Sequence, residues 1–265
     1  MNLESIEAKA SDNLRHTYLS LGLSLPGSRL IQEDGFKACV GVQNHPICNF
    51  ALDLKLDPWV VRSLSRLAAH HASFRIYLSP SDRPNHAEEL VCRSGFQETY
   101  ALAVLVSGGA DRQVQLPIKK VHTVDDRRQV AEFMAAQFFN LHQPEFRNTI
   151  AEATFLAEDL DLYRVGDEGR PQAAFMLSGI GDTLGLYNLC VSARSRRRGL
   201  GAKLLDWCKN AALSENRSLI LQCDTSLESW YSRNGFRSLG QIRVFSLPNA
   251  LSTDIITTGS LLSRA

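Results

Sequence analysis

The sequence predicts an α/β fold in which helices flank a mixed sheet, repeated in two similar halves. Three observations support this fold class. Short apolar runs alternate with segments whose apolar residues recur at helical spacing. The loop-forming stretch Ser107-Gly108-Gly109 separates two regions with a similar order of elements. The pattern Arg-x-Gly-Phe occurs once in each region, at Arg93 and at Arg233, after a short helix and before a strand.

The first half is expected to begin with a helix over residues 1–25 and to continue as strands and helices. A strand over residues 29–40 is broken by a turn at Asp34-Gly35. Asp57-Pro58 is a strong helix start, because the carboxylate can cap the helix and proline suits its first position. We expect further strands over residues 47–56, 74–78 and 96–107, and helices over 58–72 and 85–94.

The second half repeats this order after a linker. Asp125 or Asp126 is expected to cap its first helix. We expect strands over residues 116–124, 163–165, 172–180, 184–191, 219–223 and 239–247, and helices from 125 to 138 and over 145–158, 199–214 and 227–233. A helix between successive parallel strands implies a right-handed crossover. The tail beyond Pro248 carries no clear pattern.

Composition argues for a soluble globular protein. The chain of 265 residues is 44% hydrophobic and 22% charged, with a formal net charge of +1, which disfavours a general nucleic-acid or membrane partner. No apolar run reaches the length of a membrane span, and the first residues lack the pattern of a signal peptide. The six cysteines show no Cys-x-x-Cys spacing. We therefore expect a cytoplasmic protein with reduced, mostly buried thiols.

A basic glycine turn connects an apolar strand that ends at Val191 to an amphipathic helix. Arg196, Gly199 and Gly201 have the spacing Arg-x-x-Gly-x-Gly. The first turn of a helix offers unpaired N–H groups and the positive end of its dipole, and glycine lets a diphosphate approach the backbone. The stretch is therefore a candidate pyrophosphate site, the alternative being a solvated basic turn. It is neither a Walker A loop nor a dinucleotide fingerprint.

The strand, basic turn and helix, followed by Tyr231-Ser-Arg-Asn-Gly235-Phe236, resemble the GNAT superfamily of acyl-CoA-dependent N-acyltransferases. The pyrophosphate motif of that family is Gln/Arg-x-x-Gly-x-Gly/Ala, and a tyrosine precedes its Gly-Phe by four residues. The resemblance implies two tandem GNAT-like domains, over residues 1–108 and 114–248, each with a mixed, mostly antiparallel central sheet. The first half lacks the glycine turn and has Val91 in place of Tyr231, so we interpret it as a degenerate copy.

The resemblance also implies the roles of particular residues. Tyr231 would be the general acid toward the departing sulfur, the alternative being an aromatic residue that packs on the sheet. Acetyl-CoA would be the co-substrate, with no metal. The residues implied to hold it are Leu189, Cys190, Val191, Arg196, Arg197, Arg198, Gly199, Leu200, Gly201 and Ala202.

Several assignments stay open at this stage. The strand before the basic turn lacks the glutamate base that many of these enzymes carry, which leaves Asp182, Tyr187 through water, or another segment. Cys190 and Cys223 suggest a covalent acyl-enzyme, but without a nearby histidine we favour buried thiols. The adjacent His70 and His71 face different ways, which favours a surface role over metal binding.

Two functions follow from these observations. The first is N-acetyl transfer from acetyl-CoA to a primary amine of a small molecule or peptide, by direct transfer in a ternary complex. The second is a catalytically silent acyl-CoA-binding protein with a role in regulation or assembly. The acceptor, the acyl chain preference and the oligomeric state do not follow from the sequence, because acceptor sites are built from variable loops.

Overall fold

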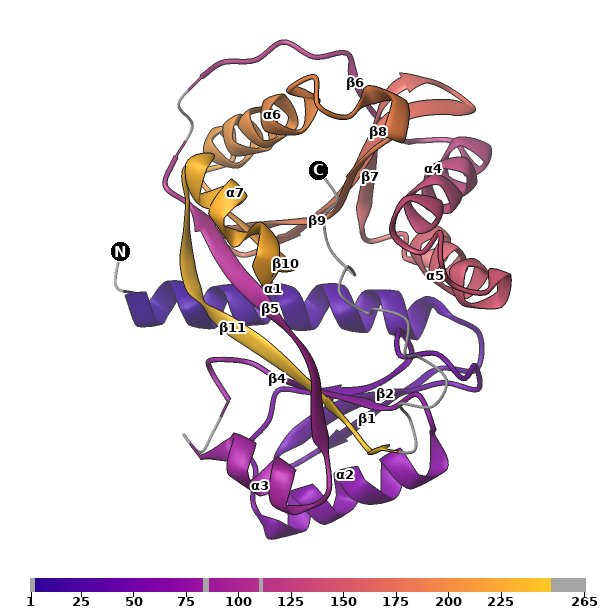
Figure 1. The fold of residues 1–265 in the computed structure, drawn as a ribbon, viewed down its shortest axis with the longest axis vertical. Helices are drawn as coiled ribbons and strands as arrows, with labels where there is room; N and C mark the ends of the chain where they lie inside the picture. The colour runs from indigo at the N-terminus through magenta and orange to yellow at the C-terminus, as the bar shows by residue number, and fades with distance from the viewer. Residues whose placement is uncertain (1–2, 83–85, 110–111, 249–265) are drawn as a thin grey trace.

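The computed structural model describes residues 3–82, 86–109 and 112–248, drawn in colour in Figure 1. The helices are α1 (Leu3–Ser24), α2 (Pro58–His70), α3 (Ala87–Arg93), α4 (Val124–Phe138), α5 (Pro144–Leu156), α6 (Leu200–Ser214) and α7 (Glu228–Arg233). The strands are β1 (Arg29–Glu33), β2 (Phe36–Val40), β3 (Asn49–Leu52), β4 (Arg75–Leu78), β5 (Gln97–Ser107), β6 (Ile118–Lys120), β7 (Asp161–Asp167), β8 (Arg170–Ile180), β9 (Thr183–Val191), β10 (Ser218–Asp224) and β11 (Phe236–Ser246).

Within the described residues the strands form one 11-stranded sheet, in the order β1-β2-β3-β4-β11-β5-β10-β9-β8-β7-β6. Two neighbouring pairs are parallel, β3 with β4 and β9 with β10, and the chain between each pair contains a helix, α2 or α6. The other neighbours are antiparallel. The predicted class, a mixed and mostly antiparallel sheet flanked by helices, is confirmed.

The two halves of the chain exchange their long strands at the centre of this sheet. Strand β5 belongs to the first half but pairs with β10 of the second, and β11 of the second half pairs with β4 of the first. The two exchanged strands also pair with each other over ten registered positions, and Figure 1 shows them running together through the middle of the molecule. As a result, the strands of the two halves form one continuous sheet instead of two separate ones.

The repeated Arg-x-Gly-Phe pattern occupies equivalent places in the two halves. Gly95 follows α3 with φ +89°, and Gly235 follows α7 with φ +81°. Positive φ is accessible to glycine without steric cost, so each glycine turns the chain from its helix into the next strand. Phe96 and Phe236, the next residues, are both buried. The sequence echo therefore corresponds to the same local helix-to-strand turn in the two halves.

Helices cover both faces of the sheet. In β8 and β9, Phe175 and Leu186 share a core cluster with residues of α6, whereas Met176 and Tyr187 share a cluster with residues of α4 and α5. This alternation is the period of two expected of strands buried on both faces. Helices α6 and α7 therefore lie on one face, and α1, α4 and α5 lie on the other.

Helix α1 crosses the middle of the molecule and contacts the second half directly (Figure 1). Asn13 donates hydrogen bonds to Ser178 O at 2.8 Å and to Thr183 Oγ1 at 3.2 Å, and its Oδ1 accepts one from Tyr187 at 2.8 Å. A Cβ on Gly185 would lie only 2.2 Å from Asn13 Oδ1, so this close approach requires glycine in β9. The first helix of the chain is thereby bonded to the strands of the second half.

The structure differs from the sequence expectations at several boundaries. Thr123, rather than Asp125 or Asp126, caps α4, because its side chain accepts the N–H of Asp126 at 3.2 Å. The Asp126 carboxylate instead pairs with the buried Arg164 at 2.7 Å. Strands β3 and β6 are shorter than the runs 47–56 and 116–124. Residue 85 of the helix expected over 85–94, and the tail from residue 249, lie outside the described residues.

Candidate active site

Strands β9 and β10 separate at the end of the sheet that leads to the basic turn. Their parallel pairing runs from Thr183 and Ser218 as far as Leu186 and Leu221. Beyond that point β9 continues to Val191 and β10 to Asp224, with no further pairing between them in the described residues. The edges of the two strands that face each other beyond Leu186 are therefore available to a ligand.

A β-bulge in β9 accompanies this separation. The register with β8 shifts between Ala174 and Met176, and Asn188 on the facing strand has φ +52°. One extra residue in a strand bends it and increases its twist, and bulges occur frequently beside active sites. Leu189 and Val191 then pack toward α6, while Cys190 packs toward α4. The bulge therefore sets the direction of the three residues that the resemblance implied for the cofactor.

Helix α6 starts directly beyond β9 with no capping side chain. Its N-cap, Gly199, has φ +75°, and a Cβ there would meet nothing within 4 Å. Its N-terminal turn, with Leu200, Gly201 and Ala202, is only partly buried. In contrast, Asp57 caps α2 by accepting the N–H groups of Trp59 and Val60 at 2.8 and 2.7 Å. The start of α6 thus keeps the open N–H groups that an anion requires.

The three arginines of the turn have different surroundings. Arg196 Nε donates to Val191 O at 2.9 Å, and its Nη2 donates to Gln137 Oε1 of α4 at 3.2 Å. Arg196 therefore ties the turn to β9 and α4. Arg197, with φ +58°, and Arg198 are exposed and supply positive charge beside the helix start.

Tyr231 lies on α7, just past the end of β10. Its side chain is 1% exposed and makes edge-to-face contacts with Trp230 and Phe236, with ring centroids 4.7 and 5.7 Å apart. In the equivalent place of the first half, Val91 is also fully buried. The ring of Tyr231 therefore packs as an aromatic residue on the sheet would. These ring contacts do not assign a role to the hydroxyl.

The residues named as alternative bases are poorly suited to that role. Asp182 lies in the turn before β9, at the end away from the bulge, and its carboxylate pairs with Lys9 at 2.5 Å. The Lys9 ammonium holds the pKa of Asp182 below its usual value, which weakens it as a base. Burial raises the pKa of Tyr187, and its hydroxyl already donates to Asn13. Neither group is poised to accept a proton near neutral pH.

The cysteines are free thiols, and Cys92 is exposed while the others are buried. Burial raises the pKa of both Cys190 and Cys223 to about 12, so their thiolates are scarce near neutral pH. This agrees with the preference for buried thiols over a covalent intermediate.

No group of three or more metal-ligating side chains occurs in the described part of the chain. His70 is exposed in the last turn of α2, and His71 is the residue that ends that helix. Among the described residues, no helix is both long and apolar enough to cross a membrane.

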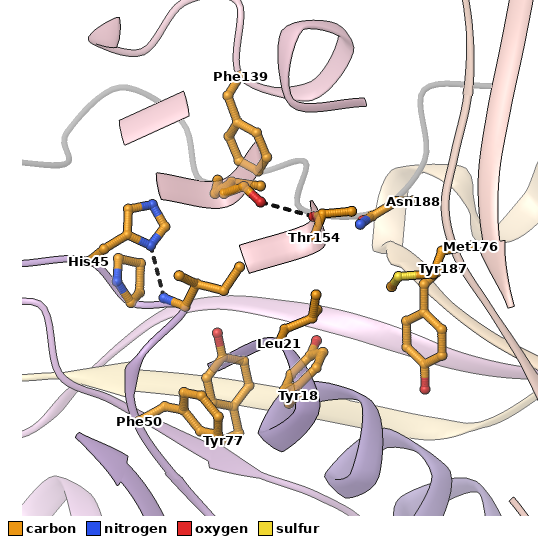
Figure 2. Close-up of a pocket in the computed structure, with 13 residues that line it drawn as sticks. Tyr18, Leu21, His45, Phe50, Tyr77, Phe139, Thr154, Met176, Tyr187 and Asn188 are labelled. Carbon is orange, nitrogen blue, oxygen red and sulfur yellow. Dashed lines mark hydrogen bonds between the residues drawn. The ribbon is translucent and has the colours of Figure 1, made fainter. Parts of the chain in front are cut away.

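A cavity opens on the face of the sheet opposite α6. Its volume is about 60 Å³, and Figure 2 shows the side chains around it. Tyr18 and Leu21 come from α1, Phe139 follows α4, and Tyr187 and Asn188 come from β9. No pattern noted in the sequence predicted this cavity. Asn188, a lone polar residue in an apolar strand run, was the one local signal that could have indicated it.

Comparisons with known proteins agree with this geometry. Residues 153–238, about a third of the chain, match the family model of the acetyltransferase (GNAT) domain. The matched segment contains β9, the basic turn, α6, β10 and Tyr231. The chain carries a GNAT acetyltransferase domain. This domain indicates acyl transfer as the class of chemistry, and no curated protein matches this chain by sequence.

Solved structures extend the likeness of the GNAT fold across both halves. A GCN5-related N-acetyltransferase from Kribbella flavida is similar over 92% of this chain and 96% of its own, with TM-score 0.63 and 13% identity. A GNAT-family protein from Novosphingobium aromaticivorans is similar over 82% and 89%, with TM-score 0.54 and 18% identity. A tandem GNAT protein from the clavulanic acid biosynthesis pathway is similar over 83% of both chains, with TM-score 0.52 and 12% identity. At these identities the likeness concerns the fold.

Proposed function

We propose that the chain is an N-acetyltransferase that moves an acetyl group from acetyl-CoA to a primary amine of a small molecule or peptide in a ternary complex. The observation that carries this proposal is the uncapped start of α6 beside the separated ends of β9 and β10. The diphosphate of CoA binds the N–H groups of Gly199 to Ala202, with Arg197 and Arg198 alongside. The pantetheine arm follows the open edge of Leu189 to Val191.

The chemistry needs few groups from the protein. The amine nitrogen forms a bond to the thioester carbon, the carbon–sulfur bond breaks, and its electron pair leaves on sulfur. The nitrogen gives one proton to solvent, the sulfur takes one from its protein donor, and that donor is reprotonated from solvent, so CoA departs as a thiol. Tyr231 is the proposed proton donor to sulfur. The acceptor amine arrives neutral, since Asp182 and Tyr187 are not poised to take its proton.

The alternative function is a catalytically silent acyl-CoA-binding protein. The observation that favours it is the lack of a carboxylate in β9 and among the residues that line the cavity. Release of free thiol from acetyl-CoA in the presence of a panel of primary amines separates the two functions. Amine-dependent release supports the enzyme, and CoA binding without release supports the silent protein.

The decisive variant for cofactor binding is Gly201→Glu. Its side chain adds bulk and negative charge at the first turn of α6, so titration calorimetry should show at least tenfold weaker CoA binding. Leu213→Glu is the matched control, because it adds the same charge to an exposed position about three turns along the same helix. Equal CoA affinity of Gly201→Glu and the wild type would show that the diphosphate does not bind at this turn.

A further inference from the structure

The cavity opposite α6 is built jointly by the two halves of the chain. Phe50 and Tyr77, from β3 and β4 of the first half, line it together with Met176 of β8 and Ile150 of α5. Figure 2 shows the aromatic rings of Tyr18, Phe50 and Tyr77 grouped on one side of it. The proposed cofactor site lies on the α6 face, so the two sites approach the separated strands from opposite faces of the sheet.

The lining of the cavity carries no charged side chain at neutral pH. None of its lining residues is Asp, Glu, Lys or Arg. Burial, together with the nearby charges of His142 and Arg75, lowers the pKa of His45 to about 3, so its ring is neutral. Because an uncompensated charge is costly to remove from water, such a lining disfavours a polycationic or acidic occupant.

Most hydroxyl groups of the lining are already used within the protein. Tyr18 donates to Gln222 Oε1 at 3.0 Å, Tyr187 donates to Asn13, and Thr154 donates to Ile150 O at 2.9 Å. The occupant is therefore recognised mainly by apolar contact. An apolar cavity with few convergent polar groups is typical of small-molecule sites.

Asn188 is the polar residue placed where the cavity meets the separated strands. It is the residue of positive φ at the bulge, and its side chain lines the cavity (Figure 2). Within the described residues, its amide makes no hydrogen bond. A side-chain amide has an oxygen that accepts and a nitrogen that donates, so it can hold the N–H of an amine while the lone pair faces away.

We propose that this cavity holds the body of the acceptor, and that the acceptor is a primary amine on an uncharged, apolar body of about the size of an aromatic ring. This inference rests on the proposed function. Asn188 is a positioning residue that orients the amine toward the thioester. The first half therefore supplies acceptor specificity through α1, β3 and β4.

Titration calorimetry on the full chain loaded with CoA tests the inference directly. The probes are 2-phenylethylamine, which has an apolar body, and spermidine, which is a polycation. We expect 2-phenylethylamine to bind at least tenfold more tightly than spermidine. Equal binding of the two amines, or tighter binding of spermidine, would overturn the proposed acceptor class.

A variant that fills the cavity provides a second test of the inference. Ile150→Trp should weaken the binding of 2-phenylethylamine at least tenfold. It should raise the KM for this amine rather than lower kcat, and it should leave CoA affinity unchanged. Leu21→Phe replaces it as the test if the tryptophan variant does not fold. Leu213→Trp enlarges an exposed leucine outside the cavity and is the matched control. Unchanged amine binding in the folded cavity variant contradicts the inference.

Two further outcomes separate this inference from the proposed function. If wild-type chain binds no CoA, the proposed function fails, and titration of 2-phenylethylamine into the unloaded chain still decides whether the cavity binds an apolar amine. If Ile150→Trp abolishes use of hexanoyl-CoA but leaves amine affinity unchanged, the cavity holds the acyl chain, and the acceptor inference is wrong.

Discussion

Tyr231 illustrates how one side chain can serve both packing and chemistry. Its ring lies between Trp230 and Phe236 in a buried cluster of the second half, and Val91 fills the equivalent place in the first. Packing explains why a large apolar residue is needed there, but it does not require a hydroxyl. The hydroxyl is therefore the part of this residue that a test must isolate.

The substitution Tyr231→Phe keeps the ring and removes the proposed proton donor. We expect kcat for acetyl transfer to fall by about 10²-fold, in line with loss of a general acid, while CoA affinity stays unchanged. Because protonation of the departing sulfur belongs to the chemical step, pre-steady-state kinetics should place the loss in that step. A kcat equal to that of the wild type would leave Tyr231 with packing alone.

At the scale of elements, the two halves differ most in how their equivalent crossover helices begin. Helix α2 starts with Pro58, which has no N–H, and the Asp57 carboxylate accepts two of the next N–H groups. Helix α6 starts at Gly199 with no side-chain cap. The same position in the fold is therefore closed by the protein in the first half and left open in the second, which supports a degenerate first half.

This contrast predicts one CoA site per chain. In Asp57→Asn the amide oxygen still caps α2 but the charge that repels a diphosphate is gone, and we expect calorimetry to give one site, as for the wild type. Gly201→Glu should remove that same site. A titration with two sites per chain, or CoA bound at the start of α2, would show that the first half is a working copy.

At the scale of the whole molecule, the exchange of β5 and β11 makes each half depend on the other. Strand β5 pairs with both β10 and β11, so the sheet of the second half includes a strand from before the linker. Helix α1 is bonded through Asn13 to β8 and β9. We propose residues 1–108 and 114–248 as two structural repeats, and we expect them to fold together.

Scanning calorimetry of the full chain checks this expectation. Because β5, β11 and α1 join the halves, we expect one cooperative unfolding transition, with the calorimetric enthalpy equal to the van't Hoff enthalpy. CoA should raise the temperature of the whole transition. Two separate transitions, with CoA shifting only one of them, would mean that the halves are independent domains.

Features set by a few neighbouring residues were predictable from the sequence. Asp57-Pro58 starts α2, the glycine turn precedes α6, and the glycines at 95 and 235 end their helices, because caps and turns depend on local backbone angles. The cap of α4 was mispredicted. The Asp126 carboxylate pairs with Arg164, a residue distant in the sequence, and Thr123 caps the helix instead. The cofactor residues and Tyr231 remain predictions, since they follow from a motif and no bound ligand has tested them.

The sequence by itself determined the alternation of strands and helices, the Arg-x-Gly-Phe pattern found once in each half, and the motif of the basic turn. Only the tertiary structure decided the strand exchange, the separation of β9 from β10 at the Asn188 bulge, and the cavity between α1 and β9. The physical reason is the sequence separation over which each feature is determined. Periodicity and caps act over a few residues, whereas strand partners and cavity walls bring together segments such as Tyr18 and Tyr187 that are far apart in the chain.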